Sequence, residues 1–327
     1  DWLWIKNRDD VEQHHLMDSN RGANKFMHSN STDDERDGSY NGGHNDINAF
    51  GSNGFTITSS GSNDELNFGS RLYVTWQWKA NGGTTTSTNA SGSTSDDTDI
   101  IASVRQTNTT AGFSIITYTG DSTSGKKVTH GLGATPEIII IKNRDSNSEP
   151  WAVFTTPTGV KALALNTSVA QATDSGYWSD TNPDSTHFTV GSHGSTGAAA
   201  DFVAYAFKSI QGYSKFGSYT GNGDADGPFV HLGFKPAWVI IKGITVEHAW
   251  LMYDNIRDSD GNPNDTVILG SDTTAEFTSS NKIDFLSNGF KLVSNSVQTN
   301  DNNQSFLYMA FAEHPFVSSK GIPVTAK

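Results

Sequence analysis

The chain contains no cysteine among its 327 residues, which excludes disulfide bonds and thiolate metal sites. Long apolar runs are also missing. The longest purely aliphatic stretch, Ile138 to Ile141, is far shorter than the ~20 residues that cross a bilayer, so we expect no membrane insertion. No signal peptide is visible, and the chain begins with Asp1 instead of Met, so we expect a fragment, a processed product or an unseen start.

Positive charge is scarce. The sequence has 22 Lys and Arg against 35 Asp and Glu, which gives a net charge of -13, and no basic stripe interrupts this balance. Such a chain repels phosphate backbones, so we expect no nucleic-acid partner. This acidity is compatible with high solubility, with cation binding or with a salty medium, and it does not distinguish among the three.

Signals for long helices are absent as well, because no capped segment follows a 3.6-residue period for long enough. The region from Asp18 to His28 predicts at most a short helix. Strand signals are common: Val74, Trp76 and Trp78 alternate with polar residues, and 32 glycines include several in Asn-Gly and Asp-Gly turns. Aromatic residues reach 11% and must carry much of the core. The sequence predicts an all-β fold of antiparallel sandwiches.

One pattern occurs three times along the chain. Each copy begins with an apolar strand that ends in lysine, at residues 2–6, 138–142 and 238–242. A second shared segment is clear at residues 50–57 and 285–292 and weaker at 187–190, and each copy closes with an aromatic strand at 73–79, 202–208 or 307–313. The order predicts three tandem β-sandwich units with a jelly-roll or concanavalin-like fold.

These matches set the expected boundaries. We expect a first unit at residues 1–83, a linker rich in Gly, Ser, Thr and Asn at 84–111, a second unit at 112–210, a third at 211–316, and a C-terminal tail at 317–327. The second and third units share an opening segment that begins Gly112-Phe113-Ser114 and Gly212-Tyr213-Ser214. The first unit lacks this segment, so its sheet has an unpaired edge that invites another chain.

Several of these segments together are similar to a known domain. They are Trp4 to Arg8, Asp18 to Ala23, Ser52 to Thr56, Ala111 to Ile115, Thr117 to Gly120, His130 to Gly133, Gly212 to Gly223, Asp284 to Leu292 and Tyr308 to Glu313. The chain resembles, over nearly its whole length, a domain of unknown function that recurs in tail-fibre-like and other virion proteins of marine and cyanobacterial phages. The resemblance implies a location on the virion exterior. It implies no reaction and supplies no catalytic residues.

We therefore expect a non-catalytic structural or adhesion protein of a bacteriophage virion surface, such as a tail fibre, a head fibre or a capsid decoration. Its expected partners are other virion proteins and further copies of itself, with a trimer favoured by analogy with fibres. One alternative is a carbohydrate-binding module for host surface glycans. Another is a polysaccharide depolymerase, although no Gly-x-Ser-x-Gly elbow and no defined pair of carboxylates supports an enzyme.

Two residues are candidates for glycan binding. Tyr177 and Trp178 stand among polar residues between Asp174 and Asp184. An exposed aromatic ring in a polar loop can stack on a sugar ring. The alternative is that the tryptophan folds back and covers the core of the sandwich.

A calcium site is the one cofactor that the sequence suggests. The oxygen-bearing residues Asp258, Asp260, Asn262 and Asp265 surround Gly261. Closely spaced oxygen ligands on a glycine turn can hold Ca²⁺, although the order differs from an EF-hand and the distal glutamate is missing. The alternative is a solvated acidic loop.

An Asp and an Arg three residues apart occur at the same position in the first and the third unit. Asp18 and Arg21 follow Lys6 at the same offset at which Asp254 and Arg257 follow Lys242. Such a pair fixes a turn through a two-point hydrogen bond or clamps a ligand. By counting, the second unit has Phe154 and Pro157 there. The ten histidines show no recognised zinc spacing.

Overall fold

The computed structural model describes residues 1–37, 46–58, 65–90, 99–258 and 261–315. About 45% of the chain lies in strands and 4% in helices, which confirms the all-β prediction. Within the described residues the helical segments are η2 (Thr156–Thr158), α1 (Ser175–Trp178) and α2 (Val297–Asn300). In the part of the chain that the structure describes, no helix has the length and apolar character needed to span a membrane.

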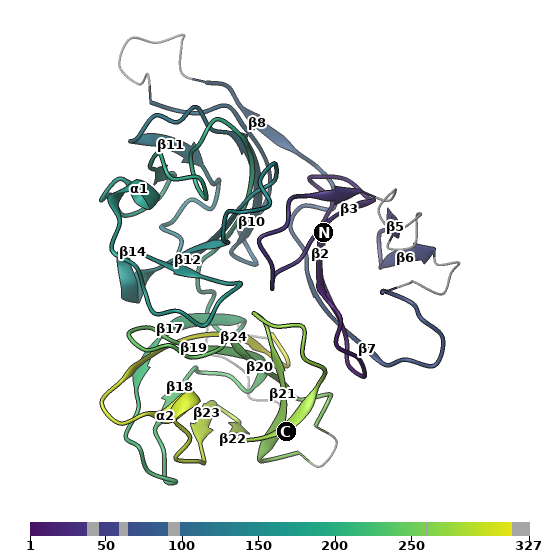
Figure 1. The fold of residues 1–327 in the computed structure, drawn as a ribbon, viewed down its shortest axis with the longest axis vertical. Helices are drawn as coiled ribbons and strands as arrows, with labels where there is room; N and C mark the ends of the chain where they lie inside the picture. The colour runs from purple at the N-terminus through teal and green to yellow at the C-terminus, as the bar shows by residue number, and fades with distance from the viewer. Residues whose placement is uncertain (38–45, 59–64, 91–98, 259–260, 316–327) are drawn as a thin grey trace.

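Three large antiparallel sheets make up the molecule (Figure 1). In order across the first sheet lie β4 (Arg36–Asp37), β3 (Lys25–Met27), β2 (His14–Asp18), β1 (Trp2–Asn7) and β7 (Tyr73–Trp78). The second sheet holds β14 (Gly159–Ala164), β13 (Ala152–Thr155), β12 (Ile138–Asn143), β16 (Asp201–Phe207), β10 (Phe113–Thr119), β9 (Ser103–Asn108) and β8 (Thr86–Thr88).

The third sheet has eight strands and is nearly closed on itself, and its two outermost strands, β17 and β18, are consecutive in the chain. Its order is β17 (Ser214–Thr220), β24 (Ser305–Ala312), β19 (Pro236–Gly243), β20 (Leu251–Asp254), β21 (Asn264–Leu269), β22 (Phe277–Leu286), β23 (Gly289–Leu292) and β18 (Phe229–His231). Two two-stranded sheets complete the described fold, namely β5 (Asp46–Phe50) with β6 (Phe55–Thr58), which follow each other in the chain, and β11 (Lys126–Thr129) with β15 (His187–Val190), which do not.

Two local predictions are wrong. The expected linker at 84–111 contributes β8 and β9, and within it Ile101 and Gln106 are buried. Pairing with β10 satisfies the main chain of β9, so a polar composition does not prevent a strand. The expected short helix from Asp18 to His28 is a turn followed by β3. The Asp18 carboxylate accepts the N–H groups of Asn20 and Arg21, and Gly22 has a φ of 103°, which no right-handed helix contains.

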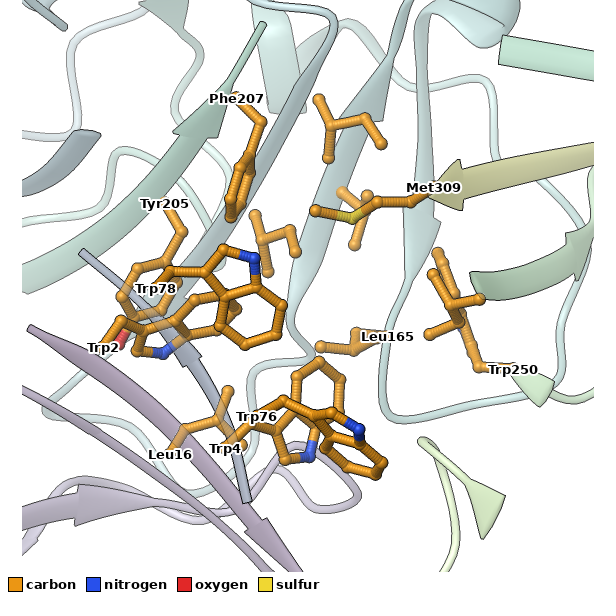
Figure 2. Close-up of a cluster of buried hydrophobic side chains, with 14 of the residues drawn as sticks. Trp2, Trp4, Leu16, Trp76, Trp78, Leu165, Tyr205, Phe207, Trp250 and Met309 are labelled. Carbon is orange, nitrogen blue, oxygen red and sulfur yellow. The ribbon is translucent and has the colours of Figure 1, made fainter. Parts of the chain in front are cut away.

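The three sheets turn one face toward a common centre. Alternate residues of their inner strands form what we call the central cluster, which includes Trp2, Trp4, Trp76 and Trp78 from the first sheet, Phe113, Ile138, Ile140, Trp151, Tyr205 and Phe207 from the second, and Trp238, Ile240, Trp250, Met309 and Phe311 from the third. Figure 2 shows Trp2, Trp78 and Tyr205 together. The ring centroid of Trp2 lies 4.5 Å from that of Trp78 and 4.4 Å from that of Tyr205. The opposite face of each sheet packs a separate core.

The central cluster is filled. A cavity of about 10 Å³ lies among its residues, at the lower limit of the room that one water molecule needs, and its lining is aromatic and aliphatic. The centre of the molecule is therefore a packing core.

The innermost strands of the three sheets have matching registers. Trp2 pairs with Trp78 as Ile138 pairs with Phe207 and as Trp238 pairs with Phe311. On the other side of the same strands, the partners are Asp18, Thr155 and Asp254. The register thus corrects the count made from the sequence, because the residues of the second sheet that match Asp18 and Arg21 are Thr155 and Thr158.

One guanidinium and one indole are among the groups that join the second sheet to the first. Arg144 donates from Nε and Nη2 to the two carboxylate oxygens of Glu35, both at 2.9 Å, and its carbonyl accepts the Glu35 N–H at 2.8 Å. Trp151 donates its Nε1–H to the carbonyl of His28 at 2.9 Å.

The first sheet is joined to the third in the same way. Arg8 donates to both carboxylate oxygens of Glu276 at 2.9 and 2.7 Å, and its carbonyl accepts the Glu276 N–H at 2.9 Å. Arg8 follows Lys6 by two residues, as Arg144 follows Lys142.

The third sheet is joined to the second by an equivalent main-chain hydrogen bond, with Ile244 at the position of the arginine. Ile244, two residues after Lys242, accepts the N–H of Gln171 at 2.9 Å, and Trp250 donates its Nε1–H to the carbonyl of Ala164 at 2.9 Å. We call these three contacts between sheets the joints. Together they close a ring of three sheets around the central cluster.

Candidate functional site

Of the two residues predicted to bind glycans, Trp178 is unavailable. It is 1% exposed and packs edge-on against Phe154, with ring centroids 5.7 Å apart. The alternative interpretation, a tryptophan that folds over the core, describes its position. Tyr177 is half-buried and stacks on His193 with ring centroids 3.9 Å apart, so one of its faces is occupied. The pair does not form a platform for a sugar.

The predicted calcium ligands are engaged in other bonds. The Oδ2 atom of Asp258 accepts the N–H groups of Asp265 and Thr266 at 2.6 and 3.1 Å, and Asp265 pairs with Lys282 at 3.2 Å. Asn262 accepts the N–H of Phe285 and donates to its carbonyl. Asp260 lies outside the described residues. The other three side chains stabilise the loop that leads into β21 through these bonds.

The repeated Asp-Arg pairs lie at two of the joints. Asp18 accepts hydrogen bonds from the Arg21 Nε and, at 2.8 Å, from the hydroxyl of Tyr205 in the second sheet. Arg21 also donates from Nη1 to Glu35 at 3.1 Å, so Glu35 is shared with Arg144. The Arg21 side chain is fully buried.

The second pair repeats this arrangement. Asp254 accepts from the Nε of Arg257 at 2.5 Å and from the indole of Trp76 in the first sheet at 3.2 Å. Arg257 donates from Nη1 to Glu276 at 3.0 Å, so this glutamate is shared with Arg8. Both pairs are occupied by protein groups, which favours the structural interpretation over a ligand clamp.

Buried lysines mark the end of the inner strand in each sheet. Lys6, Lys142 and Lys242 are inaccessible to solvent, and each Nζ donates to the carbonyl of the next residue at 2.7 Å. Burial lowers the pKa of each ammonium group to about 8, although nearby carboxylates oppose the shift.

A cluster that spacing alone does not reveal lies in the first sheet. His15 on β2, His28 at the end of β3 and Glu65 each direct one ligand atom into a common space, and these atoms lie within 4.8 Å of one another. The two imidazoles meet edge to face with centroids 4.9 Å apart, and His15 Nε2 lies 3.1 Å from Glu65 Oε2. The histidines are 1% and 2% exposed.

The imidazole of His28 is oriented by a carboxylate. Its Nδ1 lies 3.2 Å from Oδ2 of Asp33, and a carboxylate accepts only, so Nδ1 carries the proton and Nε2 offers its lone pair. Burial lowers the pKa of His28 to about 4, with the neighbouring His15 acting in the same direction and Asp33 opposing. His28 is therefore neutral at pH 7.

Sequence reasoning missed this cluster because its members lie 13 and 37 residues apart. The available signal was the pair of adjacent histidines, His14 and His15, directly before the apolar residues Leu16 and Met17. His15 pairs with Ile5 on the face that builds the separate core of the first sheet, where an apolar residue is expected.

A cavity of about 520 Å³ lies beside β7. It is lined by Asp1, Leu3, Ser19, Phe50, Gly51, Ser52, Asn53, Gly54, Phe55, Gln77, Trp78, Lys79, Gly82 and Gly83. The lining combines aromatic rings from the β5–β6 pair with the end of the outermost strand of the first sheet, which matches the size of a site for a peptide side chain or a small ligand.

Comparison with known proteins gives a family match. A model described as a domain of unknown function, DUF7483, matches residues 1–315, a range that spans all three sheets. No curated protein and no solved structure matches the chain.

Proposed function

The chain belongs to the DUF7483 family, and we propose that it is a non-catalytic structural part of the exterior of a bacteriophage virion. In this proposal three copies of one β unit, each a jelly-roll-like or concanavalin-like sandwich, interlock within a single chain. The matching registers of β1, β12 and β19 support three equivalent units. The virion location rests on the resemblance of its segments to virion proteins.

The observation that carries a structural role is the closed ring of joints. A free guanidinium-carboxylate pair on a surface contributes little to stability, but Glu35 and Glu276 are each held by two arginines next to a filled aromatic core. Such an arrangement fixes the three units relative to one another. Rigidity of this kind suits a part that bears load or presents a surface.

An antibody against the chain tests the location. Particles from a phage that encodes the chain are incubated with gold-labelled antibody and imaged by electron microscopy. We expect gold on the particle exterior. Gold confined to the soluble fraction of the lysate, with bare particles, contradicts the proposal.

The partner is proposed from the free edge of β7. Arg8 N–H donates to the Leu72 carbonyl across β1 and β7 at 2.8 Å, so the alternation of an antiparallel ladder points the main-chain groups of Thr75 and Gln77 away from β1. Within the described chain these groups have no main-chain partner, and β7 is the last strand of its sheet.

The equivalent edges of the other sheets are covered. β10 pairs with β16 and β17 pairs with β24, and in each case a tyrosine of the opening strand stacks on a phenylalanine, Tyr118 on Phe202 and Tyr219 on Phe306. We infer that a strand of a neighbouring virion protein with this aromatic pattern adds to β7 and fills the cavity beside it.

A peptide tests this mode of assembly. The peptide with the sequence of residues 112–120 is added to the whole chain, and amide hydrogen exchange is followed by mass spectrometry. We expect slower exchange in residues 73–78. The chain variant Gln77→Pro is a matched control, because it removes an outward donor and leaves the bonds to β1 intact. Equal exchange with and without peptide contradicts strand addition and leaves the virion location to the antibody experiment.

The alternative is a carbohydrate-binding module. Trp178, one of the two aromatic residues predicted to stack on a sugar, is buried and cannot serve this purpose. Glycan arrays separate the two functions, because a scaffold that acts through shape binds no glycan. Digestion of host polysaccharide tests the remaining alternative, a depolymerase, and we expect none.

A further inference from the structure

We propose that His15, His28 and Glu65 form a zinc-binding site. Two imidazole nitrogens and one carboxylate oxygen are a donor set that Zn²⁺ takes in proteins, with a fourth position left for water. The three ligand atoms lie within 4.8 Å of one another. Ligands of a tetrahedral zinc ion are about 3.3 Å apart, so small side-chain rotations close the site.

The histidine nitrogens need such a partner. Neither the His15 Nε2 nor the His28 Nε2 makes a hydrogen bond in the described chain, although His15 Nε2 faces Glu65 Oε2 at 3.1 Å, and both nitrogens are buried. A buried polar atom without a hydrogen bond is destabilising, because it loses its bonds to water. A bound cation compensates for that loss at both nitrogens at once.

The other two sheets show that the fold itself does not require these side chains. The strand register places Ala152 and Leu251 where the first sheet has His15. It likewise places Ala164 and Leu269 where the first sheet has His28. Aliphatic residues fill these positions twice, so the imidazoles of the first sheet serve a purpose other than packing.

A second carboxylate completes the arrangement. Asp33 lies 3.2 Å from the Nδ1 of His28 and holds the imidazole with its Nε2 directed at the site. Carboxylate support of this kind is a regular feature of histidine ligands to zinc, and its loss weakens the affinity 10-fold to 100-fold. Glu65 is 18% exposed, which gives an ion a path from solvent.

The site is tested on the whole chain by calorimetric titration with zinc chloride after dialysis against a chelator. We expect one Zn²⁺ per chain and a rise in the melting temperature on binding. The double variant His15→Ala, His28→Ala copies residues that occupy the equivalent places in the second sheet, and we expect it to lose binding and the thermal shift. His231→Ala, an exposed histidine on β18, is the matched control and keeps both.

The variant Asp33→Asn keeps all three ligands and guards against a folding defect in the double variant. We expect its zinc affinity to fall 10-fold to 100-fold. In the wild-type chain loaded with Co²⁺ we expect the visible absorption bands of a four-coordinate site. A wild-type chain that binds no Zn²⁺, or one whose binding is unchanged in both the double variant and Asp33→Asn, overturns the assignment.

Discussion

Arg144 and Glu35 join two sheets through two parallel hydrogen bonds, both 2.9 Å long, although 109 residues separate them. The geometry is that of a bidentate guanidinium-carboxylate pair, which is stronger and more directional than a lysine pair. Glu35 also accepts from Arg21, so its single carboxylate is shared between two guanidinium groups at the joint.

Replacing Glu35 with Gln is expected to destabilise the chain by about 3 kcal/mol, because Arg144 then loses its bidentate partner and Arg21 keeps only Asp18 of its two carboxylate partners. Unfolding in urea, followed by tryptophan fluorescence, measures the change. Asp145→Asn serves as the control, since this neighbouring carboxylate accepts one main-chain bond, from Asp201, at an exposed position. A loss for Glu35→Gln no larger than that for the control contradicts the role of the joint.

Acid is expected to open the same joint. Burial opposes ionisation of Glu35, but hydrogen bonds from Arg144 and the charges of Arg21 and Arg144 lower its pKa to about 2 from 4.5. The unfolded chain therefore binds this proton at a higher pH than the folded chain does. The contribution of Glu35 is complete above pH 4.5 and is lost as the pH falls through about 2.

This dependence is measured by comparing the unfolding free energy of the wild type and Glu35→Gln from pH 7 to pH 2. The difference between the two chains is expected to shrink as the pH falls below 4.5. A difference that stays constant over this range means that Glu35 does not titrate with folding.

The repeated strands were predictable because period and register follow directly from the alternation of side chains. Val74, Trp76 and Trp78 alternate in the sequence and point into the central cluster in the structure, except that Val74 lies at its border. The way in which the sheets meet was not predictable. Trp2 and Tyr205 are in contact across 203 residues, and no local pattern encodes that separation.

Functional residues were harder to recognise from the sequence for a related reason. Trp178 stands among polar residues, but its own short helix turns it inward, and polarity of neighbours does not report the direction of a side chain. His15 and His28 are separated by a turn that was expected to be a short helix. In the structure this turn connects β2 to β3, and the pairing of these strands brings the two imidazoles into contact.

The acidic loop around Gly261 is expected to depend on hydrogen bonds and not on a cation. Replacing Asp258 with Asn removes the acceptor charge that holds the N–H groups of Asp265 and Thr266, and we expect a loss of about 1 to 2 kcal/mol. Thermal unfolding with and without added Ca²⁺ gives the comparison. A melting temperature of the wild type that rises with Ca²⁺ and stays unchanged in the variant indicates a calcium site here after all.

The ring of sheets is expected to unfold as one unit because the three sheets share the central cluster. Replacing Trp2 with Ala removes a fully buried indole that touches Trp78, Phe113 and Tyr205, so we expect a loss of about 3 to 5 kcal/mol. Trp178→Ala is the matched control, since this indole is equally buried but packs in the separate core of the second sheet. Amide hydrogen exchange distinguishes the two variants: Trp2→Ala should speed exchange in all three sheets, whereas Trp178→Ala should do so mainly in strands β10 to β16. If Trp2→Ala speeds exchange in the first sheet alone, or if the wild type unfolds in separate steps, the sheets are independent bodies and the joints do not couple them.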